Sequence, residues 1–219
     1  MLGIYGAGGL GTEILDLARA INKSTPIWDD IVFIADIEGL TNVDGVPVYA
    51  LEDFCAVGKE AEVIVALGDP SLRHGLYEKV AGCGLKIATL IHPNAQIGHG
   101  TRIGSGCVIQ YGVFVSCNVT LGDNVLLQPS CSVGHDVIIG TSSVLSSYVS
   151  VAGKCRIGSG TYLGLNCPVR DCITIGSNTI IGMGSVVQRD IPDEVIAMGN
   201  PARVIQRNTE HRVFSNQKE

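Results

Sequence analysis

The chain has 219 residues, of which 46% are hydrophobic and only 5% aromatic, and its net charge is −6 at pH 7. This length provides one large or two small domains with a substantial core, and the acidic balance argues against nucleic-acid binding. The first residues, MLGIYGAGG, lack the basic and apolar regions of a signal peptide. No run of about 18 apolar residues occurs, so the sequence predicts no membrane-spanning helix and a cytoplasmic protein.

Residues 1–90 have the pattern of alternating strands and helices. The stretch LGIYGAGGLGTEILDLARAI predicts a strand, a glycine-rich turn and a helix, because Gly6, Gly8 and Gly11 fit G-x-G-x-x-G and the following apolar residues have helical spacing. Further strands are predicted in IVFIAD and AEVIVALG, and a second helix in DPSLRHGLYEKVAG. We therefore expect a small Rossmann-like parallel sheet covered by helices.

The glycine motif indicates a phosphate-binding turn at the N-terminus of the first helix. In a dinucleotide fold Asp36, at the end of the second strand, would contact a ribose. The N-terminal region has room for a mononucleotide-binding half only. A tight turn that binds no ligand is the alternative interpretation.

From residue 91 onward every sixth residue is aliphatic. The positions from 91 to 187 hold seventeen Ile, Leu or Val residues in succession. Glycine often follows the aliphatic residue, and the residue four positions after it is small or β-branched. This pattern is typical of a solenoid of short strands and tight corners. We expect a parallel β-helix over residues 91–205 and a polar C-terminal tail over residues 206–219.

Four of the eight cysteines occupy the small-residue position of this repeat: Cys107, Cys131, Cys155 and Cys167. A cysteine there fits as a small buried apolar residue. The sequence contains no CxxC pair, so disulfides and metal ligation are disfavoured.

The chain resembles bacterial sugar acetyltransferases that join a small Rossmann-like domain to a left-handed β-helix. These enzymes modify nucleotide-activated amino sugars, or sialic acid, for surface glycans such as the O-antigen. The resemblance is carried by IYGAGGLG, ALGDPSLR, GHDVIIG, YLGLN, GMGSVVQRDIP and GNPARVI, which span nearly the whole chain. It implies three hexapeptides per coil, a left hand contrary to the usual crossover rule, and a homotrimer. Residues 18 apart then stack on adjacent coils.

By this resemblance His135 is the general base that removes a proton from the sugar amine as the amine attacks acetyl-CoA. Asp136 would orient the imidazole and strengthen it as a base. Gly153, one coil further, could hold the thioester oxygen with its N–H. Stacking also brings Lys154 beside Asp136, so a structural ion pair is the competing role for this carboxylate. A surface His–Asp pair without catalytic function is the alternative for His135.

The resemblance places acetyl-CoA in the groove between adjacent β-helices of a trimer, where Leu165, Gly182 and Met183 would continue the surface that begins at Gly153. Relatives often carry a second histidine nine residues after the base, where this chain has Val144. The nucleotide-sugar site would be formed by five residues of the first domain: Gly8, Gly9, Leu10, Asp36 and Gly68.

The preferred function is N-acetylation of a nucleotide-linked amino sugar, such as a 4-amino-4,6-dideoxyhexose. Sialic acid O-acetylation fits the same residues. A zinc carbonic anhydrase on the same β-helix needs three convergent histidines, which the stacking does not supply, since His99 would lie roughly 10 Å from His135; we therefore expect no metal. A non-catalytic trimeric nucleotide-binding scaffold is the alternative from another class.

Overall fold

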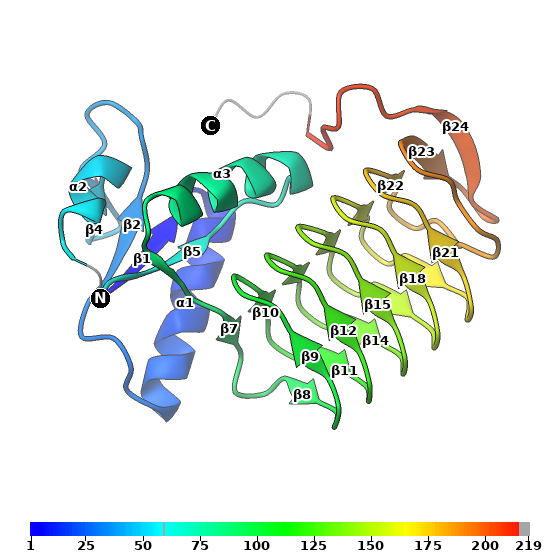
Figure 1. Cartoon of the computed structure of the whole chain (residues 1–219), viewed down its shortest axis with the longest axis horizontal. Coiled ribbons are helices and arrows are strands. Elements are labelled where there is room, and N and C mark those ends of the chain that lie inside the picture. The colour runs from blue at the N-terminus through cyan, green and yellow to red at the C-terminus, as the bar shows by residue number, and fades with distance from the viewer. Residues whose placement is uncertain (59, 215–219) are drawn as a thin grey trace.

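The computed structural model describes residues 1–58 and 60–214. An α/β unit at the N-terminus is followed by a stack of flat coils that extends away from it (Figure 1). The parallel sheet of the first unit ends with β6 (Lys86–Ile87), and the first coil strand is β7 (Leu90–Ile91).

The N-terminal sheet has the strand order β3-β4-β2-β1-β5-β6 and is parallel except for the β3–β4 pair. From β1 the chain first adds β2 on one side and later adds β5 on the other side, so the strand order reverses at β1. Ligands commonly bind at the carboxyl ends of the strands at such a reversal. The remaining bounds are β1 (Leu2–Tyr5), β2 (Ile31–Ile34), β3 (Asn42–Val43), β4 (Val46–Tyr49), β5 (Glu62–Val65), α1 (Gly9–Ser24), α2 (Leu51–Cys55) and α3 (Pro70–Gly82).

The two predicted helices form because each has a clear start and an apolar face. Helix α1 begins directly after Gly8 and buries Ile14, Leu15, Leu17 and Ala18 against the sheet. Helix α3 has Pro70 at its first position, and the Asp69 side chain accepts hydrogen bonds from the N–H groups of Ser71 and Leu72. The β3–β4 hairpin and α2 are elements that the sequence pattern did not predict.

The coils are triangular, and three parallel sheets form their sides. Each strand pairs with the strand 18 residues later, as Val115 does with Val133 and Val133 with Val151, so three hexapeptides make one coil. Face 1 contains β7, β10 (Val108–Ile109), β13 (Leu126–Leu127), β16 (Val144–Leu145), β19 (Tyr162–Leu163) and β22 (Ile180–Ile181). Face 2 contains β8 (Gln96–Ile97), β11 (Phe114–Val115), β14 (Ser132–Val133), β17 (Ser150–Val151) and β20 (Pro168–Val169). Face 3 contains β9 (Arg102–Ile103), β12 (Thr120–Leu121), β15 (Ile138–Ile139), β18 (Arg156–Ile157) and β21 (Thr174–Ile175).

The regular coil ends near the last predicted aliphatic position. Val187 pairs with Val169 only as an isolated bridge, and Ile191 then pairs with Ile175, which is 16 rather than 18 residues away. Face 1 continues into an antiparallel hairpin of β23 (Val195–Met198) and β24 (Arg203–Arg207). Beyond it, residues 208–214 run back over the coils toward α3 (Figure 1), and residues 215–219 of the predicted tail lie outside the described residues.

One buried arginine joins the two units. Arg73 of α3 is completely buried, and its guanidinium donates hydrogen bonds to the carbonyls of Val65 (2.6 Å), Asn124 (2.8 Å) and Gly106 (3.1 Å). Burial lowers the pKa of Arg73 to about 10. The outer side of face 1, including Val144, packs against α1 in the same region. The junction between the units is therefore a packed interface in which the buried guanidinium of Arg73 is hydrogen-bonded.

The four cysteines of the repeat are buried free thiols: Cys107, Cys131, Cys155 and Cys167. Burial raises the pKa of Cys131 to about 12, as expected for a structural thiol. Among the helices of residues 1–58 and 60–214, none has the length and apolar character needed to cross a bilayer.

Candidate active site

His135 and Asp136 lie at the corner between faces 2 and 3, which we call the second corner (residues 134–137, 152–155 and 170–173). The Nδ1–H of His135 donates to Oδ2 of Asp136 at 2.8 Å, and both side chains are about half exposed. Asp136 has φ +59, a left-handed turn conformation that aspartate tolerates better than most residues. The turn thus presents an imidazole whose Nε2 remains available to a substrate.

The carboxylate of Asp136 is hydrogen-bonded to His135. The hydrogen bond from His135 lowers the pKa of Asp136, and the Nδ2 of Asn118 donates to its other oxygen at 3.3 Å. Within the described part of the chain no ion pair joins Asp136 to Lys154. The structural ion pair considered from the stacking is therefore not formed.

Gly153 stacks directly on the imidazole of His135. A Cβ atom at position 153 would lie 2.6 Å from Nε2 of His135, so the ring can keep this position only beside a glycine. For the N–H of Gly153, no acceptor is found within residues 1–58 and 60–214. The structure thus brings together, on one corner, an imidazole nitrogen and a backbone donor without a partner.

A pocket of about 800 Å³ opens at the carboxyl ends of the N-terminal strands. The glycine motif builds one wall, and each glycine has a separate reason. Gly6 has φ +123, and a Cβ on Gly11 would lie 2.0 Å from the Gly6 oxygen, so both allow the close approach of turn and helix. A Cβ on Gly8 or Gly9 would meet no atom within 4 Å. The N-terminus of α1 therefore faces open space that suits a phosphate.

Asp36 lies in this pocket but is already hydrogen-bonded. It accepts from the Tyr5 hydroxyl (2.6 Å), from Lys79 Nζ (2.6 Å) and from the N–H of Leu51 (3.0 Å). The hydrogen bond from Leu51, followed by those from Lys79 and Tyr5, lowers the pKa of Asp36 to about 2. A carboxylate has about four acceptor positions, so one remains for the predicted ribose contact.

The pocket includes side chains that sequence reasoning missed. Tyr5 and Lys79 flank Asp36, Phe214 lies close to Gly68, and Gln128 lines the pocket from the coils. Tyr5 precedes the first glycine of the motif but has no role in its G-x-G-x-x-G pattern, and the other three reach the pocket only through the tertiary fold. They show that the pocket is formed jointly by the N-terminal unit, the coils and the C-terminal segment.

The three residues predicted to continue the acetyl-CoA groove lie elsewhere on the coil. Leu165, Gly182 and Met183 lie between faces 1 and 2, at the first corner (residues 128–131, 146–149, 164–167 and 182–185). Leu165 and Met183 are exposed, and Gly182 packs beneath Met198. Within one chain, face 2 separates these residues from His135.

A second hollow, of about 490 Å³, lies further along the second corner. It is lined by Arg170, Cys172, Ile173, Gln188, Arg189 and Asp190. Two arginines make it a suitable surface for a phosphate group. In the described residues, no group of three or more His, Cys, Asp and Glu side chains is arranged to hold a metal ion. Val144, the position of the second histidine in relatives, is buried under the N-terminal unit.

Two family models match the chain, one over each of the two units. A model of the PglD N-terminal domain matches residues 1–80, and a model of the GMPPB C-terminal domain matches residues 85–196. The acetyltransferase domain of PglB from Neisseria gonorrhoeae FA1090 is 30% identical, with a TM-score of 0.86 over 93% of this chain and 98% of that chain.

Two further relatives act on or bind the same sugar nucleotide. PerB from Caulobacter crescentus, solved in complex with CoA and GDP-perosamine, is 31% identical, with a TM-score of 0.84 over 93% of this chain and 96% of that chain. The GDP-perosamine N-acetyltransferase of Escherichia coli O157:H7 is 30% identical over 124 residues. That alignment spans 56% of this chain and 56% of that curated relative.

Proposed function

The chain belongs to the hexapeptide-repeat sugar N-acetyltransferases, and on that premise we propose that it transfers the acetyl group of acetyl-CoA to the amine of a nucleotide-linked amino sugar. The predicted fold, a Rossmann-like domain followed by a left-handed parallel β-helix, is the fold of this family and is confirmed. The observation that carries the proposal is the second corner, where the imidazole of His135 is oriented by Asp136 and lies against Gly153.

The reaction needs a base, an acceptor amine and a group that stabilises the thioester oxygen. With Nδ1–H held by Asp136, His135 has Nε2 free to remove a proton from the amine as the new C–N bond forms. The N–H of Gly153 donates to the thioester oxygen as negative charge develops there. His135 then returns the proton to the sulfur of CoA as the C–S bond breaks, which restores the neutral imidazole.

The two substrates would lie against different parts of the chain. A nucleotide-sugar fits the pocket at the N-terminus of α1, with its phosphates on the N–H groups of Gly8, Gly9 and Leu10. Acetyl-CoA fits the second corner, because the basic hollow with Arg170 and Arg189 continues the edge that carries Gly153. That this fold binds both kinds of substrate is supported by PerB, which was solved in complex with CoA and GDP-perosamine.

The geometry of one chain favours a shared site. The nucleotide pocket reaches the coils at Gln128, on the first corner, whereas His135 lies on the second corner. In a homotrimer the second corner of one copy would face the first corner of the next, with Leu165, Gly182 and Met183 forming the opposite side of the acetyl-CoA groove. Such packing would also bring His135 of one copy to the sugar pocket of its neighbour.

We further propose that the acceptor is a 4-amino-4,6-dideoxyhexose used for surface glycans and that the enzyme works in the cytoplasm, where acetyl-CoA is available. The support is that two relatives are named for GDP-perosamine. The predicted O-acetylation of sialic acid requires the same base and stays the alternative.

A substrate panel tests the proposal. The purified protein is incubated with acetyl-CoA and, separately, with UDP-, dTDP- and GDP-linked 4-amino sugars and with free sialic acid, and CoA release is measured. We expect release with at least one nucleotide-linked amino sugar and an amide in the product. Release with sialic acid alone would establish the O-acetyltransferase, and no release with any acceptor would favour the non-catalytic scaffold.

A further inference from the structure

The nucleotide pocket is a trough with two different ends. At one end, beyond β2, it is lined by Asp36, Ile37 and Leu40. At the other end it is lined by Gly68, by Gln128 of the coils, and by Phe214. The N-terminus of α1 lies between these ends, at Gly8 and Gly9. A ligand with phosphates at its centre would therefore extend in both directions.

A nucleotide-sugar has this form, because its diphosphate joins a nucleoside to a hexose. Its hexose must reach chemistry that takes place on the β-helix, and the end with Gln128 is the end that contacts the coils. The nucleoside then occupies the end with Asp36, away from the coils. The end with Gly68 and Phe214 becomes the hexose subsite.

Phe214 reaches this subsite because the C-terminal segment returns across the molecule. We call residues 208–214 the return segment. It starts at Asn208, which is buried and hydrogen-bonds to the carbonyls of Asn178 (2.7 Å) and Glu194 (2.8 Å). Figure 1 shows the segment leaving β24 and passing over the coils toward α3.

The far end of the return segment is fastened to Asp69. Oδ1 of Asp69 caps α3, while Oδ2 accepts a hydrogen bond from the N–H of Val213 at 2.8 Å and lies 3.6 Å from Nε of Arg212. Asp69 is only 4% exposed, so this contact is part of the packed structure. One buried carboxylate thus positions both the helix and the residue next to Phe214.

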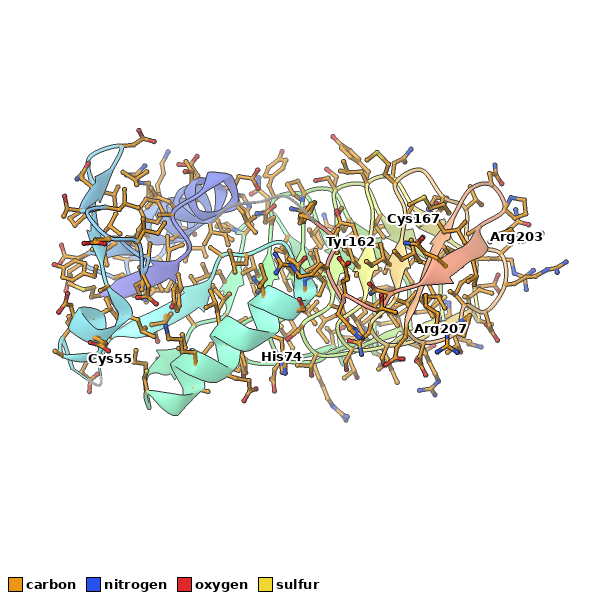
Figure 2. All side chains as sticks on the ribbon, turned by 90° about the horizontal axis from the view of Figure 1, so that it is seen from above. Cys55, His74, Tyr162, Cys167, Arg203 and Arg207 are labelled. Carbon is orange, nitrogen blue, oxygen red and sulfur yellow. The ribbon has the colours of Figure 1, made fainter. Side chains whose placement is uncertain are left out.

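Phe214 itself is held between two walls. Its ring meets the ring of Tyr162 edge-on, with centroids 5.9 Å apart, and its Cε2 would lie 3.8 Å from a Cβ on Gly68. Tyr162 is fixed in turn by a hydrogen bond from Ser146 at 2.9 Å. Figure 2, viewed from above, shows Tyr162 on the coils between α3, which carries His74, and the strand of Arg203 and Arg207.

We propose that Phe214, delivered by the return segment, forms the apolar wall of the acceptor-hexose subsite and binds the C–H face of the amino sugar. This inference rests on the proposed function. An aromatic ring fixed by Tyr162 and Asp69 offers an apolar surface that a hexose ring can cover without loss of hydrogen bonds. Phe214 acts as a substrate-positioning residue and takes no part in proton transfer.

The test compares a nucleotide-sugar with the same nucleotide lacking its sugar. Calorimetric titrations of the parent and of Phe214→Ala use GDP-perosamine and GDP, or the UDP or dTDP pair if the parent turns over that amino sugar. Phe214→Ala should weaken binding of the nucleotide-sugar about three- to tenfold. This is the loss expected when one or two carbon groups of the hexose are no longer buried against the ring. Binding of the nucleoside diphosphate and the KM for acetyl-CoA should stay unchanged.

A second variant reaches the same subsite through the anchor. Asp69→Asn keeps an oxygen that can cap α3 but replaces the acceptor of the Val213 N–H by an amide, so the return segment should detach. It should reproduce the selective loss of nucleotide-sugar binding. Ile205→Ala is the matched control, because Ile205 is an exposed residue of the same C-terminal region that does not line the pocket.

The outcomes separate this inference from the proposed function. If the parent acetylates an amino sugar but Phe214→Ala weakens the sugar-linked and bare nucleotides equally, or weakens neither, the hexose assignment is wrong and the function stands. If the parent releases no CoA with any amino sugar, the proposed function fails and the hexose subsite fails with it.

Discussion

The imidazole of His135 depends on two neighbours of opposite kinds. Asp136 is a charged partner that holds the ring through Nδ1. Gly153 has no side chain and so leaves space for the ring, because a Cβ atom there would overlap Nε2. The first contact is local, since the two residues are adjacent. The second exists only because coils stack 18 residues apart.

Adding a single methyl group at position 153 should therefore impair catalysis. In Gly153→Ala the new Cβ displaces the imidazole, and we expect kcat to fall about 10²-fold, as for a catalytic group moved by an ångström or so. Gly75→Ala is the control, because Gly75 has no atom within 4 Å of the added Cβ. Steady-state kinetics of the two variants check this, and equal activity would contradict the stacked arrangement.

Asp36 should contribute to stability at low pH in a predictable direction. Its pKa is about 2 in the folded protein and 3.8 without its partners, so its contribution is present above about pH 4 and is lost as the pH falls toward 2. The side chain is 42% exposed, and solvent screening should keep the effect to about 0.5–1 kcal/mol. Urea unfolding from pH 4 to pH 2 should show a steeper decline for the parent than for Asp36→Asn; parallel declines would contradict the assignment.

Among the elements, α3 connects the two units, because its residue Arg73 is hydrogen-bonded to carbonyls of both. Replacing Arg73 with methionine keeps much of the volume but leaves the carbonyls of Val65, Asn124 and Gly106 without their donors. We expect a loss of about 2–4 kcal/mol in the free energy of unfolding. Arg19→Met, at an exposed position on α1, should cost less than about 0.5 kcal/mol. Denaturant unfolding of both variants measures this difference. Similar losses in the free energy of unfolding would show that the buried hydrogen bonds of Arg73 are dispensable.

The elements that repeat a local pattern could be predicted from the sequence. The aliphatic residue at every sixth position predicts the coils, and a glycine turn followed by an apolar face predicts α1. The β3–β4 hairpin, α2 and the β23–β24 hairpin have short or exposed sequences without such periodicity. The return segment is the extreme case, because Val213 meets Asp69 at a separation of 144 residues and nothing in its own sequence indicates that contact.

The same distinction applies to the candidate site. The glycines of the pocket and the His135–Asp136 pair could be found from motifs and adjacency. The partners of Asp36 could not, because Tyr5 and Lys79 lie 31 and 43 positions away and approach it only in the folded sheet. Leu165 and Met183 are predicted for the same groove as Gly153; they lie on a different corner of the chain, so they share a groove with Gly153 only where two copies meet.

At the scale of the whole molecule, a site shared between copies would allow two inactive variants to complement each other. His135→Ala removes the proposed base, and Gly8→Leu places a side chain in the open pocket, where an added Cβ meets no atom within 4 Å. If each site takes the base from one copy and the pocket from the next, co-expressed trimers should retain about a quarter of the parent's activity. Sedimentation should show trimers, and the two variants purified separately and mixed without subunit exchange are the control. Absence of recovered activity in true mixed trimers, or full activity in a monomer, would contradict the shared site.

The most direct measurement is the turnover of a folded His135→Ala protein with acetyl-CoA and the amino sugar that the parent uses best. His135 is at an exposed corner beyond the buried residue Val133, so the coils and the thermal unfolding midpoint should be unaffected. We predict that kcat falls by about 10²–10⁴ with little change in binding of either substrate, and that Asp136→Asn loses less. Near-normal turnover by a correctly assembled His135→Ala protein would contradict the account.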